Sequence, residues 1–397
     1  MGQKRILIAA FAAAFLGTMA FRISIPAVAF YTRNVLKGTM LELGLLTSSF
    51  FTARAVSAVA AGKIADKARG LHLLISSCFL IHSAIVFLYV LASSWAHVML
   101  LRALQGILNG LAWVSVQFVL GSSVEAEVRG RAYSAYFLSG SFGSLAGNLV
   151  FSAMASAPME DVMSLSAIMF ALTAIASLFL AGPGGRANPR PGQLSRSSSG
   201  AGASGHLLAW TCLMVFGSRA LNSLLMGDVI YIYLSEVVGM GPSLASALVG
   251  SAALIGLAAS MPVSWLADKK GDGPALSLAV GLASAGALMF PLRHPAPSVT
   301  GYILLVIGTL SLVPLVRKLA MTYQRERGLA LGLVNAVGNV GTASGSILLG
   351  SALEALGTST ILFLGLELLE AVLIVSLSLL AVVGISVLWV RRALRGL

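Results

Sequence analysis

The sequence predicts an all-α integral membrane protein with twelve transmembrane helices, arranged as two pseudo-symmetric six-helix bundles. Its 397 residues are 57% hydrophobic and only 10% charged, with a mean hydropathy of +0.92, whereas an average soluble domain is about 25% charged. Apolar blocks of about 18 residues or more recur along the whole chain, each long enough to cross a bilayer. Charged motifs that nearly repeat themselves in the second half of the chain indicate two similar bundles.

The twelve predicted spans follow these apolar blocks. They are placed at residues 6 to 30, 41 to 62, 72 to 92, 98 to 121, 131 to 154, 162 to 181, 207 to 235, 243 to 265, 274 to 292, 299 to 319, 329 to 352 and 360 to 389. The first block follows Lys4 and Arg5, as in a signal peptide. Because its apolar run is too long for one and eleven more spans follow, we interpret it as a retained helix.

Lys and Arg residues are distributed unevenly between the two sides that these spans define. Of the 26, 19 fall in segments on the side of the N-terminus and 3 fall on the other side. Because cytoplasmic loops carry an excess of Lys and Arg, this asymmetry predicts a multi-pass protein of the cytoplasmic (plasma) membrane with both termini cytoplasmic. The net charge of +12 therefore indicates contact with anionic membrane lipid and not with nucleic acid.

A segment rich in Gly, Pro, Ser and Arg interrupts the apolar pattern near the middle of the chain. Residues 182 to 206 begin with GPGGRANPRPGQLSRSSSGAGASG, a composition that predicts a flexible cytoplasmic linker. It divides the chain into an N-terminal six-helix bundle, residues 1 to 181, and a C-terminal six-helix bundle, residues 207 to 397.

The two predicted bundles carry similar charged motifs at corresponding places. Asp66 in GKIADKARG follows the second span, and Asp268 in SWLADKKGDG follows the eighth, 202 residues later. Arg129 in EVRGRA opens the fifth span, and Arg327 in RERGLA opens the eleventh, 198 residues later. Two landmarks in register indicate a tandem duplication, as in transporters built from parallel repeats.

These motifs resemble those of the major facilitator superfamily. The signature that follows the second span is matched, with the last Arg and Gly in a slightly different order, by Gly62, Asp66, Lys67, Arg69 and Gly70. The Arg-Gln-Gly signature of the fourth span resembles Arg102, Gln105 and Gly106 in LRALQGILNG. The antiporter motif of the fifth span lacks its usual Gly-Pro in SGSFGSLAGNLV, which leaves exchange with protons open. The resemblance covers essentially the whole chain and implies solute transport.

Arginines within the spans are the main candidates for substrate binding. A charge at the bilayer centre costs at least about 2.5 kcal/mol, so each of these must face a cavity, find a partner or reach the interface. In the superfamily, spans one, four, seven and ten line the pathway, so the resemblance implies that Arg22, Arg102 and Arg219 converge on one cavity. Asn222 shares a helix face with Arg219. The alternative is that Arg22 and Arg102 bond backbone carbonyls or reach the outer interface. Arg54 is interpreted as a helix-packing or motif-supporting charge.

The chemistry of the guanidinium group points to an anionic substrate, since Arg pairs bidentately with carboxylate or phosphate. Arginines in the first and seventh spans also resemble those of the organophosphate/phosphate exchangers of this superfamily. Asp228 is the candidate for proton coupling. It lies nine residues after Arg219, about half a turn around the helix, so an ion pair between them is disfavoured unless Gly227 breaks the helix. No acid lies in span one or span four, which weakens the comparison with multidrug exporters.

The resemblance also implies a conformational latch at the cytoplasmic ends of the spans. In the superfamily, the Asp after the second span meets the eleventh span, which here begins beside Arg327. By the repeat, Asp268 would meet the fifth span beside Arg129. We expect this latch to hold the two bundles together in the outward-open state, through Gly62, Asp66, Lys67, Arg69, Asp268, Lys269, Arg129 and Arg327.

The sequence predicts a secondary active transporter of a small organic solute that works by alternating access, of the efflux type. One alternative is transport of an organic anion or phosphate ester through the intramembrane arginines, and another is a receptor that binds without transport. No phosphate-binding loop, catalytic constellation or metal-ligand spacing is present, so we expect no enzyme activity, cofactor or metal. The expected partners are a small-molecule substrate, a coupling proton or ion and membrane lipid, and the protein is expected to be a monomer.

Overall fold

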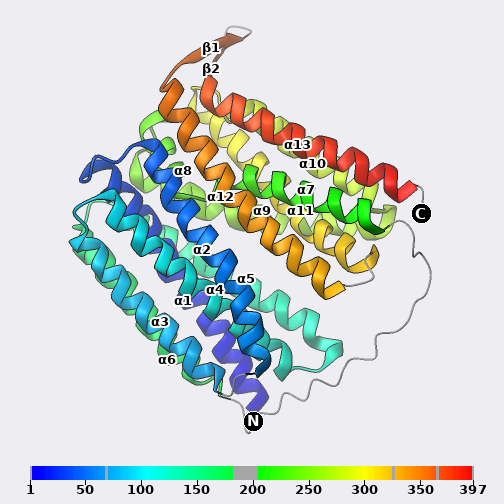
Figure 1. Cartoon of the computed structure of the whole chain (residues 1–397). Coiled ribbons are helices and arrows are strands. Elements are labelled where there is room, and N and C mark those ends of the chain that lie inside the picture. Colours follow the sequence, from blue (N-terminus) through cyan, green and yellow to red (C-terminus); the bar gives the residue numbers. More distant parts are fainter. Residues whose placement is uncertain (1, 68–69, 182–203, 324–326, 364–365, 396–397) are drawn as a thin grey trace.

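The computed structural model describes residues 2–67, 70–181, 204–323, 327–363 and 366–395, and it shows long antiparallel helices with one small hairpin (Figure 1). The elements are α1 (Gly2–Asn34), α2 (Met40–Lys67), α3 (Leu71–Leu88), η1 (Tyr89–Leu91), α4 (Trp95–Ser123), α5 (Ala126–Ala153), α6 (Met159–Leu178), α7 (Ser204–Ser223), α8 (Asp228–Ile232), η2 (Tyr233–Val237), α9 (Gly241–Lys270), α10 (Asp272–Met289), α11 (Pro295–Tyr323), α12 (Arg327–Leu356), β1 (Thr360–Phe363), β2 (Leu366–Leu369) and α13 (Glu370–Arg395).

Two ends of the molecule serve as landmarks. The terminal end carries both chain termini, and the hairpin end carries β1 and β2 (Figure 1). We call α1 to α6 the N-terminal half and α7 to α13 the C-terminal half. Most of the predicted linker, residues 182–203, lies outside the described residues.

Ten helical segments of the described chain are long and apolar enough to cross a membrane. The predicted set of twelve also includes α5 and α12, which are 28 and 30 residues long. Both are rich in Gly, Ser and Asn, which lowers their hydropathy. In membranes these residues allow helix backbones to approach closely, so the lower hydropathy reflects packing against other helices.

Two of the predicted spans have wrong boundaries. The span expected at residues 207 to 235 is interrupted after Ser223, and α8 begins only at Asp228, preceded by Gly227 in extended backbone. The span expected at residues 360 to 389 begins too early, because residues 360–363 and 366–369 pair as antiparallel strands, with Thr360 opposite Leu369. An apolar run alone does not separate a strand from a helix.

Glycines set the closest helix contacts within each half, and they do so in the same way in both. A Cβ atom on any of four glycines would lie 2.2–2.4 Å from a backbone oxygen of the neighbouring helix. They are Gly143 and Gly147 in α5, which face Phe15 and Met19 of α1, and Gly341 and Gly345 in α12, which face Phe216 and Ala220 of α7. The two pairs are separated by the 198 residues of the sequence repeat.

The two halves also pack against each other through small residues, near the hairpin end. A Cβ atom on Gly44 of α2 would lie 2.4 Å from the backbone oxygen of Ser346 in α12. On the other side, Gly250 of α9 packs against the Asn148 side chain of α5. A Cβ atom on Gly250 would lie 2.7 Å from the Cβ atom of Asn148. One buried hydrophobic cluster is continuous across both halves here, whereas the terminal end of the C-terminal half forms a separate cluster.

We predict that Gly44→Ala destabilises the protein, because the backbone oxygen facing the new methyl group cannot rotate away and the halves must separate slightly. Overpacking of this kind costs about 1–3 kcal/mol. The measurement is the apparent melting temperature of the purified protein. Gly281→Ala is the matched control, because nothing lies within 4 Å of its Cβ position and alanine favours helix. Equal melting temperatures for the two variants would contradict the contact.

Candidate functional site

A central cavity of about 330 Å³ lies between the two halves. Its walls come from α1, α2, α4 and α5 of the N-terminal half and from α9, α11 and the α7–α8 connection of the C-terminal half. The lining residues are Ala14, Thr18, Arg22, Arg54, Trp113, Gln117, Tyr136, Phe137, Gly140, Ser141, Ser144, Met226, Ala253, Leu257 and Leu310. The described residues of this lining thus include two arginines and neither Asp nor Glu.

Arg22 is the deepest charged residue of the lining, counted from the terminal end. It lies roughly 20 residues from the start of α1, or about 30 Å at 1.5 Å per residue. Its Nη1 atom is buried without a hydrogen-bond partner among the described residues, while its guanidinium faces the Tyr231 hydroxyl. A buried donor without a partner is costly, so this atom is available to a ligand or to ordered water.

Arg54 of α2 also lines the cavity, although its sequence context suggested only a packing role. The structure shows that the packing role belongs to its backbone and the cavity lining to its side chain. Its backbone oxygen would lie 2.8 Å from a Cβ on Gly110, so the Arg54 backbone packs tightly on α4. Its side chain lines the cavity instead, with the guanidinium 5.8 Å from the ring centroid of Phe51. A charge near the middle of an apolar span was a visible signal for this residue.

Arg219 and Asn222 occupy different surroundings, although they share α7. The Asn222 side chain donates to the Thr309 hydroxyl, 3.1 Å away, and so ties α7 to α11. Arg219 packs beside Gly338 of α12, with the Arg219 Cγ atom 3.3 Å from the Cβ position of that glycine. Within the described residues it has no hydrogen-bond or ion-pair partner.

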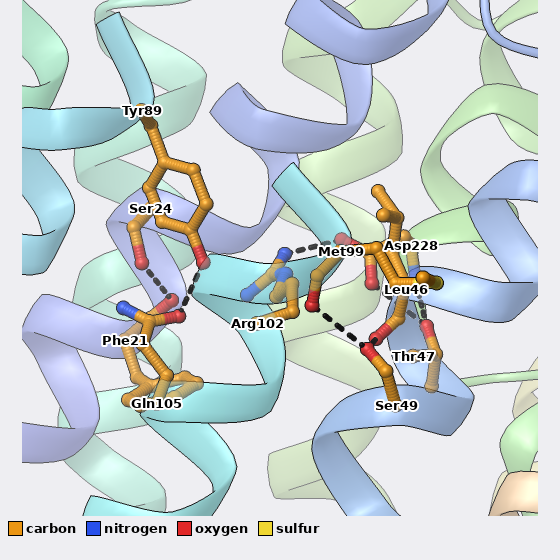
Figure 2. A network of polar contacts seen from close by, with 10 residues as sticks. All are labelled: Phe21, Ser24, Leu46, Thr47, Ser49, Tyr89, Met99, Arg102, Gln105 and Asp228. Atoms are coloured by element: carbon orange, nitrogen blue, oxygen red, sulfur yellow. Dashed lines mark hydrogen bonds and ion pairs between the residues drawn. The ribbon is translucent and has the colours of Figure 1, made fainter. Parts of the chain in front are cut away.

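Arg102 forms a buried ion pair with Asp228 across the two halves (Figure 2). The Arg102 Nη2 atom donates to Oδ1 of Asp228, and the two side chains are only 2% and 4% exposed. Thr47 completes the contact: its hydroxyl donates to Oδ2 of Asp228 at 2.7 Å and accepts from the Asp228 backbone N at 2.9 Å. Tyr89 covers the guanidinium, its ring centroid 5.8 Å away.

The interruption of the seventh span explains how this pair forms. Gly227 takes extended backbone, so the chain turns away from the axis of α7 before Asp228 starts a new short helix. The carboxylate can therefore reach α2 and α4 of the other half. Arg102 is thus held by Asp228 and does not line the cavity.

Hydrogen bonds and ion pairs that join described residues of the two halves gather towards the hairpin end. Besides the Arg102 and Thr47 contacts with Asp228, they join Tyr231 and Ser246 to Asn148, Ser152 to Ser243, the Met40 backbone N to Glu354, and Arg33 to Glu236. The cavity extends from this sealed region towards the terminal end, where Gln117 lies near the last turn of α4. Figure 1 shows the halves diverging there.

The sequence matches the family model of the Major Facilitator Superfamily over residues 10–346. The protein belongs to this superfamily. No curated protein matches the sequence. Membership makes it a membrane transporter of a solute.

Solved structures of other transporters share the fold of this superfamily member. A bacterial homologue of the human lysosomal transporter Spinster, in its inward-facing and occupied conformation, is 16% identical with a TM-score of 0.75, and the match covers 98% of this chain and 96% of that one. A POT family transporter in complex with 5-aminolevulinic acid is 14% identical with a TM-score of 0.75, over 98% and 96%. The nucleoside transporter NupG is 13% identical with a TM-score of 0.67, over 98% and 98%.

In this transporter, three polar residues share one face of α4, beginning with Arg102 of the ion pair. They are Arg102, Gln105 and Asn109, spaced so that they lie above one another. Gln105 Oε1 accepts from the Tyr89 hydroxyl at 2.7 Å, but Arg102 Nε, Gln105 Nε2 and Asn109 Oδ1 are buried without partners among the described residues. Buried groups of this kind bind ordered water, so this face of α4 is suited to hold a short row of waters.

The predicted latch residues are only partly described. Arg69 lies outside the described residues, as do the side chains of Asp66, Lys67, Arg129 and Arg327. Nothing lies within 4 Å of the Cβ position of Gly62. Lys269 stacks on Trp265 of its own helix, 4.1 Å from the ring centroid, and Asp268 lies in the same last turn of α9. The latch therefore stays a prediction. No group of three metal-ligating side chains is found in the part of the chain that the structure describes.

We predict that Asp228→Asn or Arg102→Gln alone destabilises the protein by about 3–5 kcal/mol, because each leaves a buried charge without its partner. The double variant should recover most of this loss. Unfolding of the purified protein, analysed as a double-mutant cycle, measures the coupling. Strictly additive single effects would show that the two residues are not energetically paired.

Proposed function

We propose that this protein is a secondary active transporter that moves a small organic anion across the cytoplasmic membrane by alternating access. One observation carries the proposal. The cavity between the halves is lined by Arg22 and Arg54, and none of the described residues in its lining is acidic. Of the functions that the sequence left open, this favours the organic anion or phosphate ester over export of drug-like compounds in general.

Electrostatics supports an anionic occupant. Desolvated cations in the low-dielectric interior are costly unless they are paired, and neither lining arginine has an acidic partner among the described residues. A carboxylate or phosphate group binds the guanidinium fork through two hydrogen bonds. Trp113, Tyr136 and Phe137 line the same space and offer apolar surface to the organic body of the substrate.

The arrangement of the halves supports alternating access with this structure as the inward-open state. The hydrogen bonds between described residues of the two halves gather at the hairpin end, and the cavity extends towards the terminal end, which the distribution of Lys and Arg predicts to be cytoplasmic. The similar Spinster homologue is also inward-facing. In the proposed cycle, residues 1 to 181 and 207 to 397 rock as two bundles about the cavity. Protonation of Asp228 would weaken its pair with Arg102 and favour opening of the hairpin end.

We predict that Arg22→Gln lowers flux of a transported organic anion at least about tenfold, because one lost charge-assisted hydrogen bond is worth about 1.5–3 kcal/mol. The measurement is uptake of radiolabelled anions into proteoliposomes. Arg293→Gln is the matched control, because this exposed arginine lies at the hairpin end beside Glu367. Binding without flux would favour the receptor alternative. Unchanged anion flux in Arg22→Gln would refute the assigned site.

We predict that Asp66→Asn shifts the conformational equilibrium towards the inward-open state and slows transport without preventing membrane insertion. The reason is that the latch would lose its negative charge at the cytoplasmic ends of the halves. Labelling of single cysteines placed along the cavity reports which side is open. The latch hypothesis fails if both accessibility and flux match those of the unchanged protein.

A further inference from the structure

The central cavity has more positive charge around it than its lining alone shows. Arg219 and Arg317 belong to the C-terminal half and are not part of the lining, yet both lie beside it. The Arg317 guanidinium is 5.9 Å from the ring centroid of Phe137, a lining residue of the other half. The charges of Arg54 and Arg317 both act on Arg219. Three arginines from two halves thus gather in one region.

The internal repeat places Arg219 next to the cavity independently. Phe15 and Met19 of α1 occupy the same positions against α5 glycines as Phe216 and Ala220 of α7 occupy against α12 glycines. In this register the residue equivalent to Arg219 is Thr18, which lines the cavity. Each of the two also lies beside an equivalent glycine, Gly140 for Thr18 and Gly338 for Arg219.

Along their helices the four arginines lie at three depths. Arg54 is roughly 13 residues from the end of α2 and Arg219 roughly 15 from the start of α7, which places both about 20 Å from the terminal end. Arg317 is roughly 6 residues from the end of α11 and therefore nearer that end. Arg22, at about 30 Å, is deeper than Arg54 and Arg219 by about 7–10 Å along the helix axes.

We propose that the substrate is an organic dianion with two separated anionic groups, one bound by Arg22 and the other by a second subsite of Arg54, Arg219 and Arg317. This inference rests on the proposed anion transport and names its substrate class. Three positive charges so close together need negative charge to compensate them. None of these three arginines has an acidic partner within the described residues. The apolar body between the two groups lies along Trp113 and Phe137.

The second subsite draws on both halves, and this gives the dianion a mechanical effect. Arg54 belongs to the N-terminal half, whereas Arg219 and Arg317 belong to the C-terminal half. An anionic group between them attracts the two halves towards each other on the terminal side of the cavity. The bound dianion therefore favours closure of that side, whereas a monoanion held by Arg22 alone does not.

Binding of matched ligands to the full-length purified protein tests the proposal. The probes are the dicarboxylates succinate, adipate, suberate and sebacate, with monomethyl suberate as the equal-length monoanion. We expect an affinity maximum at adipate or suberate and at least about tenfold weaker binding of the monoester. Arg219→Gln and Arg317→Gln should each remove most of this preference, Arg219→Lys should keep part of it, and Arg293→Gln should leave it unchanged.

The outcomes separate this inference from the proposed function. Equal binding of suberate and its monoester, in the unchanged protein and in both Gln variants, would refute the dianion but leave anion transport standing. Absence of binding by every probe would overturn both. Tighter binding of glycerol 3-phosphate than of suberate would show that the two charges sit on one group, which contradicts the separated subsites. If the Gln variants do not fold, the chain-length series on the unchanged protein decides.

Discussion

The buried pair of Arg102 and Asp228 is the interaction on which the arrangement of the two halves depends. It is the most deeply buried charge pair of the described chain, and it joins α4 to α8 across the boundary between the halves. Thr47 completes the hydrogen bonding of the carboxylate, and the Tyr89 ring lies beside the guanidinium. Because separating the two charges in a dry interior is costly, the pair keeps the hairpin end closed and leaves the cavity accessible from the terminal end.

Around this pair, the repeat supplies two equivalent scaffolds. The glycines of α5 and α12 bring α1 and α7 to the same close distance on either side of the cavity. The scaffolds match, but the residues on them do not: Thr18 in one half corresponds to Arg219 in the other. A symmetric frame therefore holds an asymmetric site, with polar neutral groups mostly on one wall and additional positive charge on the other.

The twelve helices, the duplication and the superfamily could be predicted because they depend on local hydropathy and on short motifs. The pairing of Arg102 with Asp228 could not, since it depends on the turn at Gly227 and on which helices meet across the halves. Arg54 was assigned to packing because the sequence does not show that its backbone and its side chain have different neighbours. The backbone packs on α4, whereas the side chain lines the cavity. The paired strands of residues 360–363 and 366–369 were missed because their apolar residues have no helical or strand period of their own.

The seal at the hairpin end combines two kinds of charge pair. Arg33 and Glu236 form an ion pair at its rim, with side chains 32% and 37% exposed, whereas Arg102 and Asp228 are shielded from solvent. Dissolved salt screens exposed charges and scarcely affects buried ones. The ionic strength on that face of the membrane thus acts on the rim alone. In the proposed cycle, changes in the surrounding medium therefore alter how readily the rim pair separates, whereas the energy needed to separate the buried pair is set by the protein interior.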